Sequence, residues 1–512
     1  MSEDELRGDL AELLRRRALT EDAARPEAVA RRHERGGRTA RENVADLIDE
    51  GSWVEYGRYA VAAQRARRDP DDLISGTPGD GLVAGTATVD GHPTAVLAYD
   101  YTVLAGTQGA VGHFKKDRMF ELIDRMRLPV VFFAEGGGGR PGDTDYPVVS
   151  ALQVQAFALW AKLSGRVPRI SIVNGNCFAG NAVIAGCSDL IVATESASIG
   201  MGGPAMIAGG GLGDFRPEEV GPVEMQAPNG VIDVVVADEA EAVAVARRVL
   251  GYFRGALDEW SAPDQLPLRE AVPESGRRAY DVVPIIGTLA DESSVTILRQ
   301  RFAPELVTAL ARIEGRPVGV IANNTMYLAG TVTGEASDKA ARFLQLCDAF
   351  GLPVVSLIDT PGYMVGPEHE RDALVRHCCR LLVAGAALSV SVVAIVLRRA
   401  YGLGAQAMAC GGLHQPLLTA AWPGANLGGM GLEGAVRLSM RKELEAIADD
   451  AEREQRVRDL TARAYEHAKA LNAAEIFELD DVIDPVETRS VIARTLTAAG
   501  TPAPTGRTID TW

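Results

Sequence analysis

The stretch "GRPVGVIANNTMYLAGTVTGEASDKAARFLQLCDAFGLPVVSLIDTPGYM" (residues 315–364) has a second version earlier in the same chain. That version is "GHPTAVLAYDYTVLAGTQGAVGHFKKDRMFELIDRMRLPVVFFAEGGGGR" (residues 91–140), and a shift of 224 residues aligns the two without a gap. Lys115 then falls on Lys339, and Glu135 falls on Asp359. A repeat with one constant offset predicts a tandem duplication of a single domain.

The same register extends beyond this stretch. The segment "GNCFAGNA" (175–182) lies on "RAYGLGAQ" (399–406), so that Gly180 falls on Gly404. Near the two ends the offset becomes 251 rather than 224, which leaves about 27 extra residues in the second half, within the charged, helix-prone stretch 437–472. We therefore expect two domains, 1–265 and 266–512, joined by a segment rich in proline and charge.

Strands and helices are predicted to alternate within each copy. Short apolar runs such as "TAVLAY", "LPVVFFA" and "RISIV" are typical of buried strands. Between them lie two helices with an apolar face, formed by Met119, Leu122, Ile123 and Met126 in the first copy and by Phe343, Leu346, Cys347 and Phe350 in the second. The predicted fold class is α/β with buried, mostly parallel strands.

One apolar run, residues 381–397, has a length at the short end for a membrane span. The repeat aligns it with residues 157–173, which contain Lys162, Arg166 and Arg169 and therefore cannot cross a membrane. We expect residues 381–397 to form a buried helix that passes into a buried strand, and we expect no membrane insertion.

Composition excludes several classes of protein. The net charge of −17, with only six lysines among 52 basic residues, argues against a nucleic-acid surface. The six cysteines form no C-x-x-C pair, so neither a zinc ribbon nor a disulfide framework is indicated, and no metal is expected. The charged N-terminus is not a signal peptide, and the location expected is the reducing cytoplasm.

The Asp359-Thr-Pro-Gly segment has the outline of a GTPase switch. A P-loop needs a Gly-Lys pair, and no lysine of this chain follows a glycine. The first copy of the segment reads "EGGG", from Glu135 to Gly138, which is not D-x-x-G. We therefore reject a nucleotide switch and interpret Asp359 as a turn residue at the end of a strand.

Two glycine-rich turns are the stronger candidates for a site. "NGNCFAGNA" and "RAYGLGAQA" each follow a buried strand and lead into an apolar helix. Such a turn directs backbone N–H groups at one point, a geometry that suits an oxyanion such as a thioester enolate. The candidate donors are the amides of Ala179-Gly180 and of Leu403-Gly404. The alternative is that the small residues only allow close packing of helix on strand.

Further glycines follow in "GMGGPAM" (200–206) and "WPGANLGGMGLEGAV" (422–436), which suggests a ligand face shared by both halves. Tyr101, Phe178, Tyr327 and Tyr401 could line this face or lie in the core. The chain has no G-x-S-x-G and no H-E-x-x-H, and its seven histidines stand apart. Chemistry would therefore depend on backbone donors and on a cofactor with its own reactive group.

At these motifs the chain resembles the carboxyltransferase (β) subunits of biotin-dependent acyl-CoA carboxylases, the family of the propionyl-CoA, acetyl-CoA and methylcrotonyl-CoA enzymes. The segments that carry the resemblance run over nearly the whole chain: "RRHERGGRTARENVADLIDEGSWVE", "GRPVGVIANN", "ASDKAARFLQLCDAFGLPVVSLIDTPGYMVG", "RRAYGLGAQAM", "AWPGANLGGMGLEGAV" and "LDDVIDPVETR". No single segment would suffice, but together they form a strong signal.

The resemblance implies two tandem crotonase-like (ClpP/crotonase superfamily) domains and a hexamer, a trimer of dimers, that acts in fatty acid metabolism. The active site would lie between the N-domain of one chain and the C-domain of its dimer mate. Carboxybiotin would release CO2 there, a biotin nitrogen would take the α-proton of the acyl-CoA, and the enolate would attack the CO2.

The resemblance also assigns residues to the two substrates. Residues 1–265 would form the acyl-CoA side, with Ala179 and Gly180 as the oxyanion hole for the thioester. Residues 266–512 would form the biotin side, with Leu403 and Gly404 holding the ureido oxygen. Further substrate contacts would come from Gly137, Gly138, Phe178, Gly202, Gly203, Tyr401 and Gln406, and further biotin contacts from Gly362, Tyr363, Gly428 and Gly429.

The chain departs from the family pattern at both turns. The common A-Y-G-G-A reads Ala400-Tyr401-Gly402-Leu403-Gly404, and Gln406 stands where the family often has an acid that influences the choice of acyl chain. In the first half "PCAGGA" becomes "NCFAGN". Leucine keeps the backbone amide but reshapes the pocket, so an acyl-CoA other than the usual short ones is open.

No lysine follows a methionine, so the M-K-M biotinylation site is absent from the sequence. Biotin is therefore expected on a separate subunit that carries or accompanies a biotin carboxylase. Two alternatives to carboxylation stay open. The chain could serve a decarboxylase that passes CO2 to biotin and on to a membrane pump, or it could be a non-catalytic crotonase-like scaffold, as Phe178 and Leu403 at the hole positions suggest.

Overall fold

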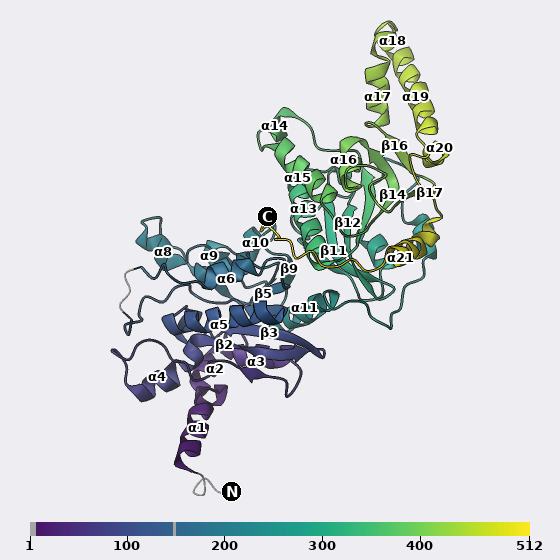
Figure 1. The fold of residues 1–512 in the computed structure, drawn as a ribbon. Coiled ribbons are helices and arrows are strands. Elements are labelled where there is room, and N and C mark those ends of the chain that lie inside the picture. The colour runs from purple at the N-terminus through teal and green to yellow at the C-terminus, as the bar shows by residue number, and fades with distance from the viewer. Residues whose placement is uncertain (1–6, 147–149) are drawn as a thin grey trace. The chain divides into compact units, whose positions relative to one another are not determined.

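The computed structural model describes residues 7–146 and 150–512 (Figure 1). The chain forms two compact units, Met1–Gly251 with Thr511 and Tyr252–Asp510 with Trp512, which we call unit 1 and unit 2. Residues 252–265, which the repeat placed with the first half, belong to unit 2, where the Tyr252 hydroxyl donates to the Ser294 carbonyl oxygen at 2.6 Å.

Unit 1 is built on a seven-stranded sheet in the order β1-β2-β3-β4-β5-β7-β9. The strands are β1 (Val54–Glu55), β2 (Leu82–Val89), β3 (His92–Tyr99), β4 (Val130–Phe133), β5 (Arg169–Val173), β7 (Leu190–Thr194) and β9 (Val234–Val236). The first three pair antiparallel and the remaining neighbours pair parallel. A separate pair, β6 (Asn176–Phe178) and β8 (Ser198–Gly200), is also parallel.

Unit 2 repeats this arrangement, with the main path β10-β11-β12-β13-β14-β15-β17. Its strands are β10 (Thr296–Leu298), β11 (Leu306–Ile313), β12 (Arg316–Asn323), β13 (Val354–Thr360), β14 (Val392–Tyr401), β15 (Leu418–Ala421), β17 (Asp481–Val482), and β16 (Asn426–Gly428), which pairs with β14. Val130 pairs with Ala95, and Val354 pairs with Gly319, so the strand register repeats with the offset of 224. The predicted α/β duplication with mostly parallel strands is confirmed.

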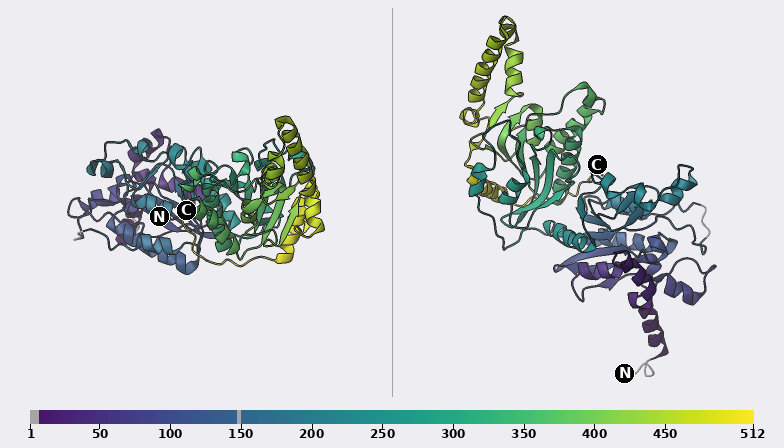
Figure 2. Two further views of the ribbon diagram at one scale, coloured as in Figure 1. Left: turned by 90° about the horizontal axis from the view of Figure 1, so that it is seen from above. Right: turned by 180° about the vertical axis from the view of Figure 1, so that it is seen from behind.

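Helices cover both sheets (Figures 1 and 2). Those that begin in unit 1 are α1 (Gly8–Ala18), α2 (Pro26–Glu34), α3 (Ala40–Leu47), α4 (Pro70–Gly76), α5 (Ala110–Met126), α6 (Ala156–Lys162), α7 (Gly180–Gly186), α8 (Pro204–Gly209), α9 (Pro217–Val220), α10 (Val223–Gln226) and α11 (Glu239–Tyr252). Unit 2 has α12 (Val283–Leu289), α13 (Gly334–Phe350), α14 (Pro367–Glu370), α15 (Leu374–Ala386), α16 (Gly402–Met408), α17 (Leu432–Ser439), α18 (Arg441–Glu445), α19 (Asp450–His467), α20 (Ala470–Glu475) and α21 (Thr488–Ala499).

The predicted apolar face of α5 is buried except at its end. Met119, Leu122 and Ile123 lie in the core of unit 1, but Met126 is 52% exposed. The reason is local, because the helix stops at Met126 and Arg127 turns the chain with φ 55°. In α13 the corresponding Phe343, Leu346 and Cys347 are buried, as predicted, whereas Phe350, the last residue of the helix, is only partly buried.

The apolar run 381–397 is a helix followed by a strand, as the repeat predicted. The helix α15 ends at Ala386 and β14 begins at Val392. Within the described parts of the chain, no helix has both the length and the apolar character that crossing a membrane requires.

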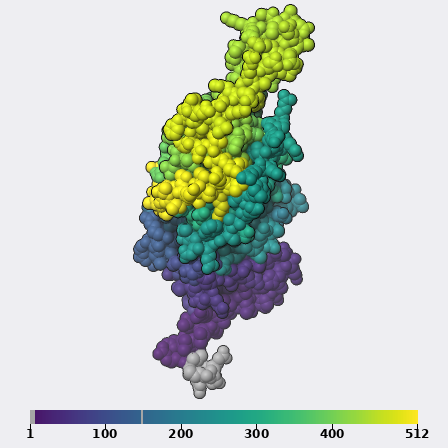
Figure 3. Space-filling view, turned by 90° about the vertical axis from the view of Figure 1, so that its right-hand side faces the viewer, coloured from purple at the N-terminus to yellow at the C-terminus, as the bar shows by residue number. Residues whose placement is uncertain are grey.

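The extra residues of the second half form helices α17, α18 and α19. These helices stand out from the sheet of unit 2, and the space-filling view shows the same projection (Figures 1 and 3). The segment is held by ion pairs between its own helices, such as Arg437 with Glu454 at 2.9 Å. The predicted charged helical excursion is therefore confirmed.

Each sheet has a buried carboxylate at the carboxyl end of an inner parallel strand, β4 in unit 1 and β13 in unit 2. Asp359, in β13, is fully buried and accepts hydrogen bonds from Arg398 Nε at 2.9 Å, Arg399 Nε at 2.6 Å and the Tyr280 hydroxyl at 2.9 Å. Our interpretation of Asp359 as a turn residue was wrong, because the strand continues to Thr360 and the carboxylate binds two arginines from the neighbouring strand.

Glu135, the counterpart of Asp359, follows β4 in unit 1 and is 4% exposed. Both of its oxygens accept from the guanidinium of Arg32 in α2, at 2.8 and 2.7 Å. The same guanidinium contacts Glu239 at 3.2 Å. The duplication therefore conserves a buried carboxylate while its arginine comes from a different part of the chain.

The aligned lysines Lys115 and Lys339 also occupy equivalent places. Each buried ammonium donates to three backbone carbonyl oxygens, those of Gly57, Gly79 and Leu82 for Lys115 and those of Phe302, Ala303 and Leu306 for Lys339. Burial lowers the pKa of Lys115 to about 8 and that of Lys339 to about 7. Both lysines fasten their helix to the loop that precedes the second strand of the unit.

We predict that Asp359→Asn destabilises unit 2 by about 3–5 kcal/mol, because two arginines then lose their buried counter-ion. Urea unfolding measures this loss as a lower midpoint. The matched control is Glu445→Gln, which removes an exposed ion pair with Arg441 and should change the free energy of unfolding by less than about 1 kcal/mol. Equal effects of the two substitutions would contradict the role given to Asp359.

Candidate oxyanion sites at two helix N-termini

The first candidate site is the turn from β6 into α7 in unit 1. Ala179 adopts φ 49° and ψ −119°, and its N–H donates to the Gly200 carbonyl oxygen in β8 at 3.1 Å. The N–H of Gly180, the first residue of α7, has no acceptor within the described residues. Of the predicted pair, only Gly180 therefore has a backbone N–H available to a ligand, which we call an open amide. Ala179 fixes the turn that orients this N–H.

Glycines surround this turn because larger residues would not fit. A Cβ on Gly138, where φ is +89°, would lie 2.8 Å from the Cβ of Ala179. A Cβ on Gly203 would lie 3.2 Å from Cδ2 of Phe178. Phe178 is itself only 4% exposed, so its ring packs among these glycines and offers little surface to a ligand.

The other two predicted glycines of unit 1 lie beside the same turn. Gly137 is exposed, and its N–H donates to the Ala105 carbonyl oxygen at 3.1 Å. Gly202 is partly exposed and directly precedes Gly203. The structure thus gathers all the predicted glycines of unit 1 around the start of α7.

The second candidate site is the turn from β14 into α16 in unit 2. The helix begins at Gly402, where φ is 59°, and the N–H groups of Leu403 and Gly404 lie in its first turn without an acceptor in the described residues. A Cβ on Gly404 would come within 2.8 Å of Cα of Gly362 and of N of Tyr363. Only glycine allows this contact between α16 and the loop that follows β13.

A pocket of about 550 Å³ opens beside α16. Gln406, Gly428 and Gly429, three of the predicted contacts, line it together with His414 and Glu478. The Leu403 side chain is 63% exposed, so it reaches the surface near the helix start without closing the turn. Tyr363 is tied down elsewhere, since its hydroxyl donates to the Cys378 carbonyl oxygen at 3.0 Å.

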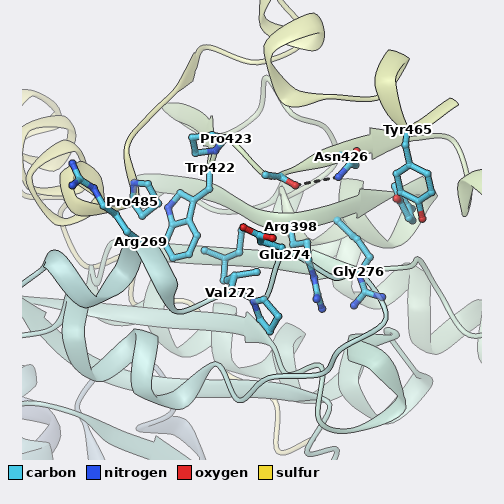
Figure 4. A pocket seen from close by; sticks show the side chains of 15 residues that line it. Arg269, Val272, Glu274, Gly276, Arg398, Trp422, Pro423, Asn426, Tyr465 and Pro485 are labelled. Carbon is cyan, nitrogen blue, oxygen red and sulfur yellow. Dashed lines mark hydrogen bonds between the residues drawn. The ribbon is translucent and has the colours of Figure 1, made fainter. Parts of the chain in front are cut away.

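Figure 4 shows a second pocket of unit 2, with a volume of about 350 Å³. Tyr401 is among the residues that line it and is 3% exposed. Burial raises the pKa of its hydroxyl above the usual range, so the group stays neutral. Arg398 and Trp422 also face this pocket. The sequence motifs did not single out Arg398, although the Arg-Arg doublet directly before the α16 turn was the signal that could have found it.

The two turns can perform the same chemistry. Each turn follows a strand and places open amide N–H groups at the start of a helix. Close glycine contacts hold each turn against a loop, the loop after β4 in unit 1 and the loop after β13 in unit 2. Open amides at a helix N-terminus stabilise an anionic oxygen, and their fixed positions avoid the cost of reorganisation when that charge develops.

Comparisons with known proteins agree with this geometry. Residues 31–504 match the family model of the carboxyl transferase domain. The chain is 33% identical over 509 residues to the biotin-dependent long chain acyl-coenzyme A carboxylase beta4 subunit of Mycobacterium tuberculosis, covering 95% of this chain and 93% of that protein.

Two solved structures are similar over nearly the whole chain. One is a single-chain, multi-domain long-chain acyl-CoA carboxylase, with a TM-score of 0.91 and 54% identity; the match covers 96% of this chain and 49% of that longer one, so our chain spans about half its length. The other is the transcarboxylase 12S hexamer with methylmalonyl-coenzyme A and methylmalonic acid bound, with a TM-score of 0.84, 30% identity and 98% of both chains covered.

The fold and these similarities show that the protein is a carboxyltransferase with crotonase-like units. The chain belongs to the carboxyl transferase family, and within it to the carboxyltransferase subunits of biotin-dependent acyl-CoA carboxylases.

We predict that Gly404→Ala lowers kcat at least about 100-fold, since the new methyl group would displace α16 from the Gly362 loop and misplace its amides. Steady-state kinetics of carboxyl transfer measure the effect. The control is Gly287→Ala in α12, because a Cβ there meets no atom within 4 Å and the residue lies in neither candidate turn. A Gly404→Ala protein that folds and retains full kcat would contradict the role of this turn.

Proposed function

We propose that the chain transfers a carboxyl group from carboxybiotin on a partner subunit to the α-carbon of an acyl-CoA. Unit 1 binds the thioester, with its oxygen at the Gly180 amide. Unit 2 binds the biotin ureido oxygen at the amides of Leu403 and Gly404. These assignments follow the family resemblance, and the chain's own contribution is to position the two reactants and to stabilise negative charge on their oxygens.

One observation carries the proposal. Gly180 and Gly404 are related by the offset of 224 residues, and each lies in the first turn of a helix with its amide open. A duplicated anion-stabilising turn suits a reaction in which two carbonyl-type oxygens become more negative. No cluster of potential metal ligands occurs among the described residues.

Carboxybiotin supplies the carboxyl group and, once that group has left, a nitrogen base for the α-proton. The residues of unit 2 fit a biotin head group. The α16 amides are available to the ureido oxygen, and Gly428 and Gly429 give the pocket of about 550 Å³ a wall without side chains. No lysine of the chain has the methionine-flanked context of a biotinylation site, which supports a biotin carrier on a partner.

The acyl group is proposed to be long. The names of two similar proteins specify long-chain acyl-CoA. Unit 1 also exposes a group of large apolar side chains directly after β8, which borders Phe178 and the Gly180 turn: Met201 is 73%, Met206 64% and Leu212 75% exposed. Such a surface beside the thioester site would gain binding energy from each methylene that it covers.

We further propose a homohexamer, by similarity to the transcarboxylase 12S assembly, and a biotin carboxylase with a biotin carrier as the partners. We also propose a cytoplasmic location, with whose reducing conditions the six free cysteines are compatible.

The proposal is tested with the full chain, a biotin carboxylase, a biotinylated carrier protein, ATP and labelled bicarbonate. A panel of acyl-CoAs from propionyl to stearoyl is assayed for label fixed in acid-stable form. We expect incorporation that depends on every component, with kcat/KM rising with chain length because longer chains bury more apolar surface.

Three outcomes are distinguishable in this experiment. Label in no acyl-CoA would contradict carboxyl transfer. If the acyl-CoAs still raise the melting temperature of the chain, the scaffold alternative replaces it. Incorporation restricted to propionyl-CoA would contradict only the long-chain assignment.

A further inference from the structure

A fully buried lysine lies in α5 of unit 1 without an ion-pair partner among the described residues. Lys116 is 0% exposed, and its ammonium donates to Oε1 of Gln108 at 2.5 Å. The rings of Tyr99 and Phe157 flank it, each with its centroid 5.7 Å from Nζ. A buried amine with one acceptor is costly to maintain, so its presence calls for a reason.

Hydrogen bonds connect Lys116 to the thioester turn. Gln108 Nε2 donates to Oδ1 of Asn181 at 3.1 Å, and the same oxygen accepts from the Gly138 N–H at 3.1 Å. Asn181 is the second residue of α7 and directly follows Gly180. The hydrogen bonds thus lead from the Lys116 ammonium to Gln108 and from Gln108 to Asn181 beside the turn. Each of these side-chain amides is oriented by the donor that precedes it.

Gln108 lies directly against Gly180. A Cβ placed on Gly180 would come within 3.0 Å of Gln108 Nε2 and within 3.0 Å of Cζ of Phe157. Two of the three groups around the Lys116 ammonium, Gln108 and Phe157, therefore also lie against Gly180, whose amide is open to a ligand. A positive charge on Lys116 reaches the turn through one polar side chain in a dry environment, where electrostatic effects are strong.

Unit 2 forms its turn without such a network. The positions aligned with Gln108, Lys116 and Asn181 are Val332, Ala340 and Ala405, all apolar. The adjacent lysine, Lys115, does have a counterpart in Lys339, and both bind backbone carbonyls. The fold of the turn thus does not require the network, and the network occurs only in the unit proposed to bind the acyl thioester.

We propose that Lys116, acting through Gln108 and Asn181, is a positioning residue for the Gly180 turn. Its positive charge strengthens the stabilisation that the Gly180 amide gives to the negatively charged thioester oxygen during enolate formation. This inference rests on the proposed function and concerns the thioester side alone. The protonated form is the active one, because only the ammonium adds positive potential behind the turn.

The surroundings of Lys116 determine the pH range of the effect. Burial lowers the pKa of Lys116 to about 7, while Asp117 on the same helix and Asp80 act in the opposite direction. Asp80 is ion-paired with Arg140. Burial, and to a smaller extent the charge of Lys116, lowers the pKa of His113 to about 3, so this imidazole, which also contacts Phe157, is neutral over the whole pH range of the test. As pH rises through about 7, Lys116 loses its proton and the added potential disappears.

The test measures kcat and KM from pH 6 to pH 9 for the biotin-dependent decarboxylation of a 2-carboxyacyl-CoA, a reaction that needs only the full chain and free biotin. We expect Lys116→Met to lower kcat about tenfold at pH 6, with KM within twofold and with the decline above pH 7 abolished. Lys116→Arg, which stays charged, should keep high kcat without the decline. Lys162→Met is the control, since that lysine is exposed in α6.

Gln108→Met is a second variant, which leaves the lysine in place but breaks its connection to Asn181. It should reproduce the loss of kcat, and it tests the inference even if Lys116→Met does not fold. The inference is overturned if Lys116→Met and wild type share one pH profile, or if the methionine and arginine variants lose activity equally. An inactive wild-type chain would instead contradict the proposed function itself.

Discussion

The buried carboxylate at the end of β4 and of β13 is the constraint on which both sites depend. In unit 2, Asp359 binds two successive arginines of β14, the strand that leads directly into α16. The position of the α16 amides is therefore fixed by a charge pair that cannot be weakened without leaving a guanidinium buried and unpaired. In unit 1, Glu135 has the same place, and its oxygen lies so close to Gly175 that a Cβ there would come within 2.2 Å.

The duplication conserves backbone geometry more strictly than side-chain chemistry. Ala105 and Ala329 both have positive φ, 54° and 55°, in the same Leu-Ala-Gly turn. A Cβ on the following glycine, Gly106 or Gly330, would approach the carbonyl oxygen of Glu135 or Asp359, at 2.8 or 2.5 Å. Around this common frame the polar side chains differ, and we propose that this difference suits unit 1 to a thioester and unit 2 to biotin.

The sequence predicted the strands, the repeat and the place of both turns, because a constant offset and apolar periodicity are properties of neighbouring residues. It did not predict the partners of Asp359, which lie 39 and 40 residues away and meet it only through strand pairing. It also gave no sign that Gly200 accepts the Ala179 N–H, since that contact depends on the pairing of β6 with β8. The roles of the site residues toward acyl-CoA and biotin remain predictions.

The most direct test of backbone catalysis is to remove one amide proton and nothing else of consequence. Leu403 suits this purpose, because its side chain is 63% exposed and proline is tolerated in the first turn of a helix. The measurement is kcat for biotin-dependent decarboxylation of a 2-carboxyacyl-CoA by Leu403→Pro and by Leu403→Ala. The account predicts a loss of about 100-fold or more for proline and near-normal activity for alanine. Equal activity of the two folded variants would contradict it.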